Sequence, residues 1–112
     1  MKHKMNLHNE PFNLIKEGTK TIELRLNDEK RQLLKEKDLI EFTNRKTLET
    51  IDTEIIKLHK YSSFEELYKH FDKISMGYNI DDAANPQDME EYYSKEEQDK
   101  YGVLGIEVKV IK

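Results

Sequence analysis

The densest set of residues that could do chemistry runs from Gly18 to Arg25, with the letters Gly-Thr-Lys-Thr-Ile-Glu-Leu-Arg. On a strand, Glu23 and Arg25 project from the same face, roughly 6.5–7 Å apart. Lys20 stands at the start of that strand, close to a flexible glycine, and can turn towards the same side. A carboxylate, a fork-shaped guanidinium and a mobile ammonium could together bind a polar, partly anionic small molecule. A solvent-exposed strand face with a salt bridge is the alternative interpretation of this spacing.

A half-buried strand over residues 19–26 must hold this segment, because its apolar and polar residues alternate. Ile22, Leu24 and Leu26 share one face of that strand. A helix that begins near Glu10-Pro11 and ends at Gly18 is predicted just before it. After it, Asn27-Asp28 is predicted to cap a short helix that ends near residue 34.

Further strands are predicted at residues 4–7, 39–43, 50–61 and 103–111, and a change of apolar phase within 50–61 indicates a bulge or bend. Ser63, Asn85 and Ser94 carry helix start signals, and residues 72–85 between the first two helices are predicted to be loop or a short turn of helix. The predicted fold is α+β, an open β-barrel of five or six mostly antiparallel strands flanked by helices. Its expected core consists of Ile22, Leu24, Leu26, Ile40, Phe42, Ile51, Ile55, Leu104, Ile106, Val108 and Val110.

The composition fits one domain over residues 1–112, with no cysteine for disulfides, thiol catalysis or thiolate metal sites. The N-terminal residues lack the apolar stretch of a secretory signal, and no window is apolar enough to span a membrane. We therefore expect a soluble cytoplasmic protein with no membrane partner. The net charge of −4 argues against binding long nucleic acid by phosphate neutralisation alone. Residues 1–60 carry 13 Lys/Arg and 11 Asp/Glu, whereas residues 61–112 carry 6 and 12, so an anionic ligand is expected at the first half.

Three other groups of residues are candidates for function: tyrosines, histidines and a basic turn. Most of the tyrosines between residues 61 and 101 are expected in the core or at an interface, but Tyr78, beside Gly77 in a polar loop, is the preferred stacking residue for a base. The four histidines show no metal-ligand spacing, so neither a metal nor a cofactor is expected. The basic turn at residues 44–46 is expected to be a hairpin tip that could contact phosphate.

The pattern Gly18-x-Lys20-x-x-Glu23-x-Arg25 resembles the signature of the ASCH family, and residues 92–106 resemble the ending of its small bacterial single-domain members. The resemblance covers essentially the whole chain and implies a PUA-like β-barrel. It also implies that the motif Lys, Glu and Arg line a cleft beside the barrel, and related PUA and EVE domains bind RNA or modified bases.

The first functional hypothesis is a binding module for RNA or a nucleotide- or nucleoside-like ligand. Arg25 would contact phosphate or a base edge, Glu23 would accept from an amine, and Lys20 would supply positive charge. The acidic second half favours a confined ligand, such as a nucleoside, a single-stranded end or a flipped base.

The alternative is an amidohydrolase, because some small relatives are thought to deacetylate cytidine with a Thr three residues after the motif lysine. Here that position is Glu23, which departs from their pattern. Lys20 and Glu23 remain the candidate catalytic residues, with the carboxylate as general base for water and Lys20 or Arg25 stabilising an oxyanion. A protein-interaction module that uses the acidic helices is the third hypothesis, and the sequence does not determine the oligomeric state.

Overall fold

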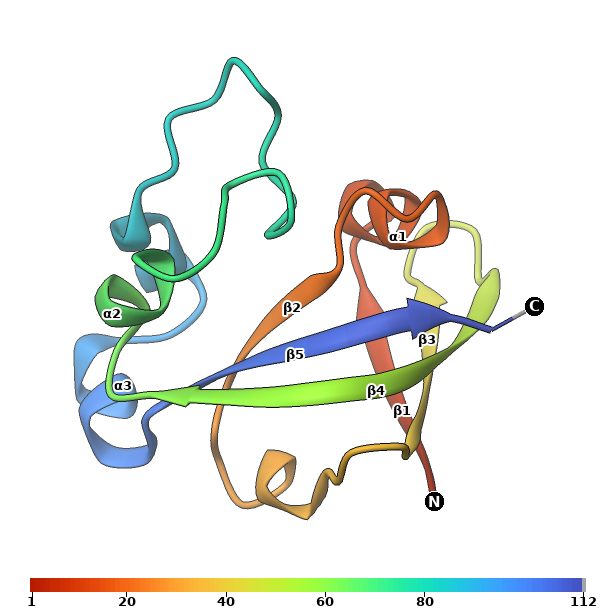
Figure 1. Ribbon diagram of the computed structural model, residues 1–112, viewed down its shortest axis with the longest axis horizontal. Helices are drawn as coiled ribbons and strands as arrows, with labels where there is room; N and C mark the ends of the chain where they lie inside the picture. Colours follow the sequence, from red (N-terminus) through yellow and green to blue (C-terminus); the bar gives the residue numbers. More distant parts are fainter. Residues whose placement is uncertain (112) are drawn as a thin grey trace.

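Five strands form one mixed sheet in the computed structural model, which describes residues 1–111 (Figure 1). The strands are β1 (Lys2–Leu7), β2 (Ile22–Leu26), β3 (Leu39–Asn44), β4 (Thr50–Tyr61) and β5 (Val103–Val110). Their order is β1-β3-β4-β5-β2, so β1 and β2 are the two edges. β1 pairs with β3 in parallel, and the other three pairings are antiparallel. The sheet curls into a half-barrel, which confirms the predicted open barrel of mostly antiparallel strands.

The bend in β4 has the cause that the sequence indicated. Ile55 pairs with Val108 and Lys57 with the adjacent Glu107, so Ile56 is an extra residue that bulges from the ladder. A bulge increases the local twist and allows a sheet to curl. Beyond it the side chains change phase, and Leu58 packs against the core while Ile56 is exposed.

Five helical segments in residues 1–111 flank the half-barrel. They are α1 (Asn9–Lys16), η1 (Arg31–Leu33), α2 (Phe64–Tyr68), η2 (Pro86–Glu91) and α3 (Lys95–Tyr101), where η denotes a 3-10 helix. In Figure 1, α2 and α3 gather at the left-hand ends of β4 and β5, and α1 lies at the opposite end. The three predicted start residues each accept a hydrogen bond from the first turn of their helix. The helix predicted up to residue 34 is only the short η1.

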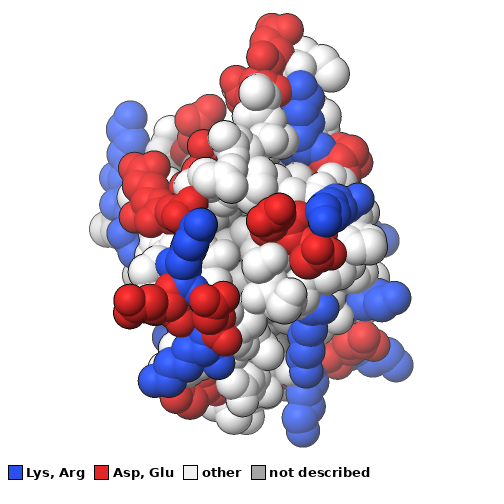
Figure 2. Space-filling view, turned by 90° about the vertical axis from the view of Figure 1, so that its left-hand side faces the viewer, with Lys and Arg blue, Asp and Glu red and all other residues white. Residues whose placement is uncertain are grey.

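The surface over the α2–α3 end carries both signs of charge, interleaved with uncharged residues (Figure 2). Within residues 1–111, no helix is long and apolar enough to cross a membrane.

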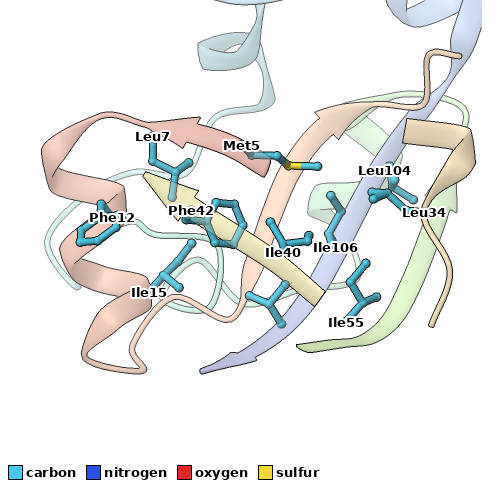
Figure 3. Close-up of a cluster of buried hydrophobic side chains, with 11 residues drawn as sticks. Met5, Leu7, Phe12, Ile15, Leu34, Ile40, Phe42, Ile55, Leu104 and Ile106 are labelled. Carbon is cyan, nitrogen blue, oxygen red and sulfur yellow. The ribbon is translucent and has the colours of Figure 1, made fainter. Parts of the chain in front are cut away.

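Two apolar clusters lie on opposite faces of the sheet. The larger fills the half-barrel and includes Phe42, Ile40, Ile106 and Leu104, with Phe12 and Ile15 of α1 closing one end (Figure 3). The second lies between β2 and α2 and contains Ile22, Leu24, Leu26, Phe64, Leu67, Met76 and Val103. Ile51 and Val110, expected in the core, are partly buried against the first cluster.

The strand β2 is therefore covered on both faces, and the prediction of a half-buried strand is wrong. Glu23 pairs with Ile106, and Arg25 with Leu104, in the ladder with β5. Directly paired residues share a face, so both charged side chains lie on the side of the sheet that forms the barrel interior. The apolar residues of β2 instead face α2.

Candidate functional site

Lys20, Glu23 and Arg25 come together as one ion-pair cluster. The Glu23 carboxylate receives Lys20 Nζ at 3.0 Å on Oε1 and Arg25 Nε at 2.7 Å on Oε2. The exposed fractions of the three side chains are 9%, 5% and 14% in sequence order. The structure thus brings the motif residues together, but as a buried cluster and not as the exposed strand face of the alternative interpretation.

Arg25 also joins the two edges of the open barrel. Its Nη2 donates to the carbonyl oxygen of Asn6, at the end of β1, over 3.0 Å. β1 and β2 are not paired with each other, so this guanidinium bridges the seam where a closed barrel would have a ladder. The site therefore lies at the open seam of the barrel.

The cluster fixes the charge of its members. Burial alone would raise the pKa of the Glu23 carboxyl, but Lys20 and Arg25 outweigh that effect and hold this pKa below its usual range. Burial likewise disfavours charged Arg25, and Glu23 and the nearby Tyr93 more than compensate, so the pKa of Arg25 is raised. One carboxylate and two cations leave the cluster with a single net positive charge.

A pocket of about 420 Å³ opens beside this cluster. Such a volume falls in the range of small-molecule sites. One wall, here called the barrel wall, consists of Asn6, Leu7, His8, Pro11, Lys20, Glu23, Leu24, Arg25 and Arg45. The facing wall, here called the insertion wall, belongs to the segment between β4 and β5 and consists of Tyr68, Met76, Gly77, Tyr78, Asp88, Met89, Glu91, Tyr92 and Tyr93.

Tyr78, the predicted stacking residue, is part of a hydrogen-bonded chain on the insertion wall. Its hydroxyl donates to Asp88 Oδ2 over 2.9 Å and lies 2.8 Å from the Tyr68 hydroxyl. Since Tyr78 has one proton to donate, Tyr68 donates to it. Burial and these two partners raise the pKa of Tyr78, so its hydroxyl stays protonated.

Tyr93 was not singled out from the sequence, although it sits beside Arg25. Its ring stacks on Phe64 with centroids 5.9 Å apart, and its carbonyl accepts from Gln98 Nε2 over 3.2 Å. Tyr68 and Asp88 were also missed. No local sequence pattern distinguishes these residues. They reach β2 only because of the way residues 68–93 fold back against it.

Gly77 makes room for the cluster on the insertion side. Its φ is +103°, and a Cβ placed there would lie 3.0 Å from Cδ of Lys20. Gly18, before the strand, also has a positive φ of +89° but open space around it. Of these two glycines, Gly77 is therefore the one whose missing side chain lets the loop lie close to Lys20.

The Ser and Thr hydroxyls near the motif lie outside the pocket. Thr19 Oγ1 donates to Glu17 Oε1 over 2.9 Å on the surface, and within residues 1–111 no Ser, Thr or Cys lines the pocket. Tyrosine hydroxyls, carboxylates, cations, the Asn6 amide, the His8 imidazole and backbone groups are the polar groups of this site.

Two of the four histidines, His3 and His59, contact carboxylates outside the pocket. His3 Nε2 lies 2.8 Å from Asp38, and His59 Nε2 lies 3.0 Å from Glu107. In the described part of the chain, no group of three His, Cys, Asp or Glu side chains could hold a metal ion.

The mixed sheet curled into a half-barrel and flanked by helices is consistent with a PUA-like barrel, and comparisons specify the class further. The profile of the ASCH domain family matches residues 5–112. The chain belongs to this family. The comparison with curated proteins found no match for this chain.

Two solved structures are similar over the whole chain. The crystal structure of hypothetical protein PH0355 has a TM-score of 0.84 and 32% identity, covering 99% of this chain and 100% of that one. The solution NMR structure of protein PF0455 from Pyrococcus furiosus has a TM-score of 0.72 and 30% identity, covering 100% of this chain and 99% of that one.

Proposed function

We propose that the chain binds a nucleobase-containing ligand, either a free nucleoside or nucleotide or an unpaired RNA residue, in the pocket between the barrel and insertion walls. The single observation that carries this proposal is the pairing of the Lys20–Glu23–Arg25 cluster with a tyrosine-rich wall across one cavity. Aromatic faces stack on bases, while arginine donors recognise base edges and phosphates. The family's PUA-like fold is often linked to RNA binding, and this supports the same conclusion.

The cluster suits binding better than hydrolysis. Each Glu23 oxygen already holds a cation, and the lowered pKa makes this carboxylate a weak base. The pocket tyrosines Tyr68, Tyr78 and Tyr93 have raised pKa values, so they stay protonated and act as hydrogen-bond donors and not as nucleophiles. Glu23 and these three tyrosines are therefore held in forms that do not favour amide cleavage.

Calorimetric titration with the four nucleosides, their 5′-monophosphates and short single-stranded RNA tests the proposal. The informative variant is Tyr92→Ala, because Tyr92 lines the pocket and is 57% exposed, so its removal should hardly change stability. An Arg25→Ala variant is less useful, since it would also leave Glu23 with one partner fewer. Loss of one stacking ring should weaken binding roughly tenfold.

Leu33→Ala is the matched control, because Leu33 is 66% exposed and lies outside the pocket lining. It should leave affinity and melting temperature unchanged. Absence of binding by every nucleoside, nucleotide and oligonucleotide would refute the proposal.

A product assay with acetylated cytidine separates binding from catalysis. We expect the wild-type protein to release no cytidine or acetate above the rate of the buffer. Turnover by wild type that vanishes in Glu23→Gln would instead identify Glu23 as the general base of an amidohydrolase.

A further inference from the structure

The two walls of the pocket carry opposite charge. The barrel wall holds Lys20, Arg25 and Arg45 against the single carboxylate of Glu23, whereas the insertion wall holds the carboxylates of Asp88 and Glu91. A ligand in this field has a preferred orientation, with its anionic end towards the barrel and its amine or ring end towards the insertion.

Arg45 is the cation of the barrel wall whose donors are free. Within residues 1–111 its guanidinium has no hydrogen-bond or ion-pair partner, and the side chain is exposed at the edge of the pocket. Arg25, by contrast, gives Nε to Glu23 and Nη2 to the Asn6 carbonyl. Lys20 likewise has Glu23 as its partner.

The end of β1 contacts both Arg45 and Arg25, which line the same pocket. The backbone N–H of Arg45 donates to the Leu7 carbonyl over 2.9 Å, and Arg25 Nη2 donates to the preceding carbonyl, that of Asn6, over 3.0 Å. Two consecutive residues of one strand therefore anchor both arginines. Arg45 lines the same cavity as Asp88 and the tyrosines, and its fork is available to a ligand there.

From this arrangement we infer that the barrel wall contains a phosphate subsite at Arg45, and that the ligand is a base bearing a terminal phosphate monoester. The inference rests on the proposed function and specifies its ligand. Arg45 forms two parallel hydrogen bonds with the phosphate. The positive charges of Lys20 and Arg25 attract it further. The base lies against the insertion wall, where Tyr78 and Tyr92 offer rings and Asp88 accepts from an exocyclic amine.

Calorimetric titration with each nucleoside, its 5′-monophosphate and inorganic phosphate tests this subsite in wild type, Arg45→Gln and Lys46→Gln. Lys46 is the matched control, because it is exposed on the same turn, carries the same charge and does not line the pocket. Both variants keep the backbone hydrogen bonds of the turn. The best monophosphate should bind wild type at least about tenfold more tightly than its nucleoside, a difference of about 1.4 kcal/mol.

Arg45→Gln should lower that ratio several-fold while nucleoside affinity stays the same, and Lys46→Gln should leave the ratio nearly unchanged. A trinucleotide with and without its 5′-phosphate distinguishes a free nucleotide from a strand end as the source of the phosphate. Equal affinity for nucleosides and monophosphates, or a ratio that Arg45→Gln does not change, would overturn the subsite and leave the proposed function standing. If no nucleoside or nucleotide binds, both fail.

Discussion

Glu23 is the carboxylate that pairs with both Lys20 and Arg25. Its two oxygens hold Lys20 and Arg25 in fixed positions, and Arg25 in turn reaches the Asn6 carbonyl across the seam. A buried ion pair adds little net stability over an apolar pair, but removing one partner leaves a buried charge without compensation. The carboxylate therefore matters mainly because two cations depend on it.

We predict that Glu23→Gln lowers the free energy of unfolding by about 3 kcal/mol at neutral pH, measured by urea denaturation. The pKa of Glu23 is lowered in the folded protein, so its contribution is present above the unfolded pKa and is lost as pH falls through the folded one. Wild type should therefore lose stability below about pH 4.5 relative to the variant, because its unfolded state takes up the proton first.

Glu36→Gln serves as the control for this pH profile, since Glu36 is exposed and has no ion-pair partner within residues 1–111. Its profile should match that of wild type. A Glu23→Gln variant as stable as wild type at pH 7 would mean that solvent, and not the carboxylate, compensates Lys20 and Arg25.

At the level of the elements, local patterns predicted where most strands and helices lie but not which face of β2 forms the barrel. The bounds of β4, its bulge and the three helix caps follow from alternation and capping residues close in sequence. Which side chains of β2 point into the barrel depends on the pairing of this strand with β5, about 80 residues later. No local signal specifies such a pairing.

The same distinction applies to the candidate site. Lys20, Glu23 and Arg25 could be found because they lie on one short strand in a recognisable spacing. Tyr68, Asp88 and Tyr93 could not, because the insertion wall is formed by an irregular segment whose path is set by tertiary packing. A segment without periodicity carries little information about which of its side chains face a cavity.

Two glycines allow the role of the insertion loop to be tested by a matched pair of variants. Gly77→Ala and Gly18→Ala both place a Cβ on a backbone with positive φ, so each should cost about 1–2 kcal/mol of stability. Only the first pushes against the Lys20 side chain. We therefore predict that Gly77→Ala also weakens nucleotide binding at least about fivefold, as 1 kcal/mol or more of contact is lost.

Thermal unfolding and calorimetric titration of both variants give the two readouts. Gly18→Ala should retain wild-type affinity once its lower stability is taken into account. Equal affinity losses in both variants would show that backbone strain, and not displacement of Lys20, weakens binding.

At the scale of the whole molecule, charge restricts the kind of nucleic acid that can bind. The chain carries −4 overall, and its second half, which supplies the insertion wall, holds twice as many acidic as basic residues. Figure 2 shows Lys and Arg interleaved with Asp and Glu at the α2–α3 end, with no continuous basic stripe on that face. A long phosphate backbone on this face would meet carboxylates as often as cations, which favours ligands that fit within the cavity.

We therefore predict that affinity depends weakly on salt and does not grow with the length of the strand. With a single phosphate contact, raising the salt from about 50 to 200 mM should weaken the binding of a 5′-monophosphate only about threefold. Proteins that neutralise many phosphates lose about a thousandfold or more over the same range.

An RNA duplex of about 20 base pairs should show no binding at about 150 mM salt, because it offers no unstacked base and meets a surface of net negative charge. Fluorescence anisotropy across a salt series measures both quantities, with an unpaired trinucleotide as the positive control. A steep salt slope together with tight duplex binding would contradict the confined site, since that combination requires an extended basic surface in contact with many phosphates.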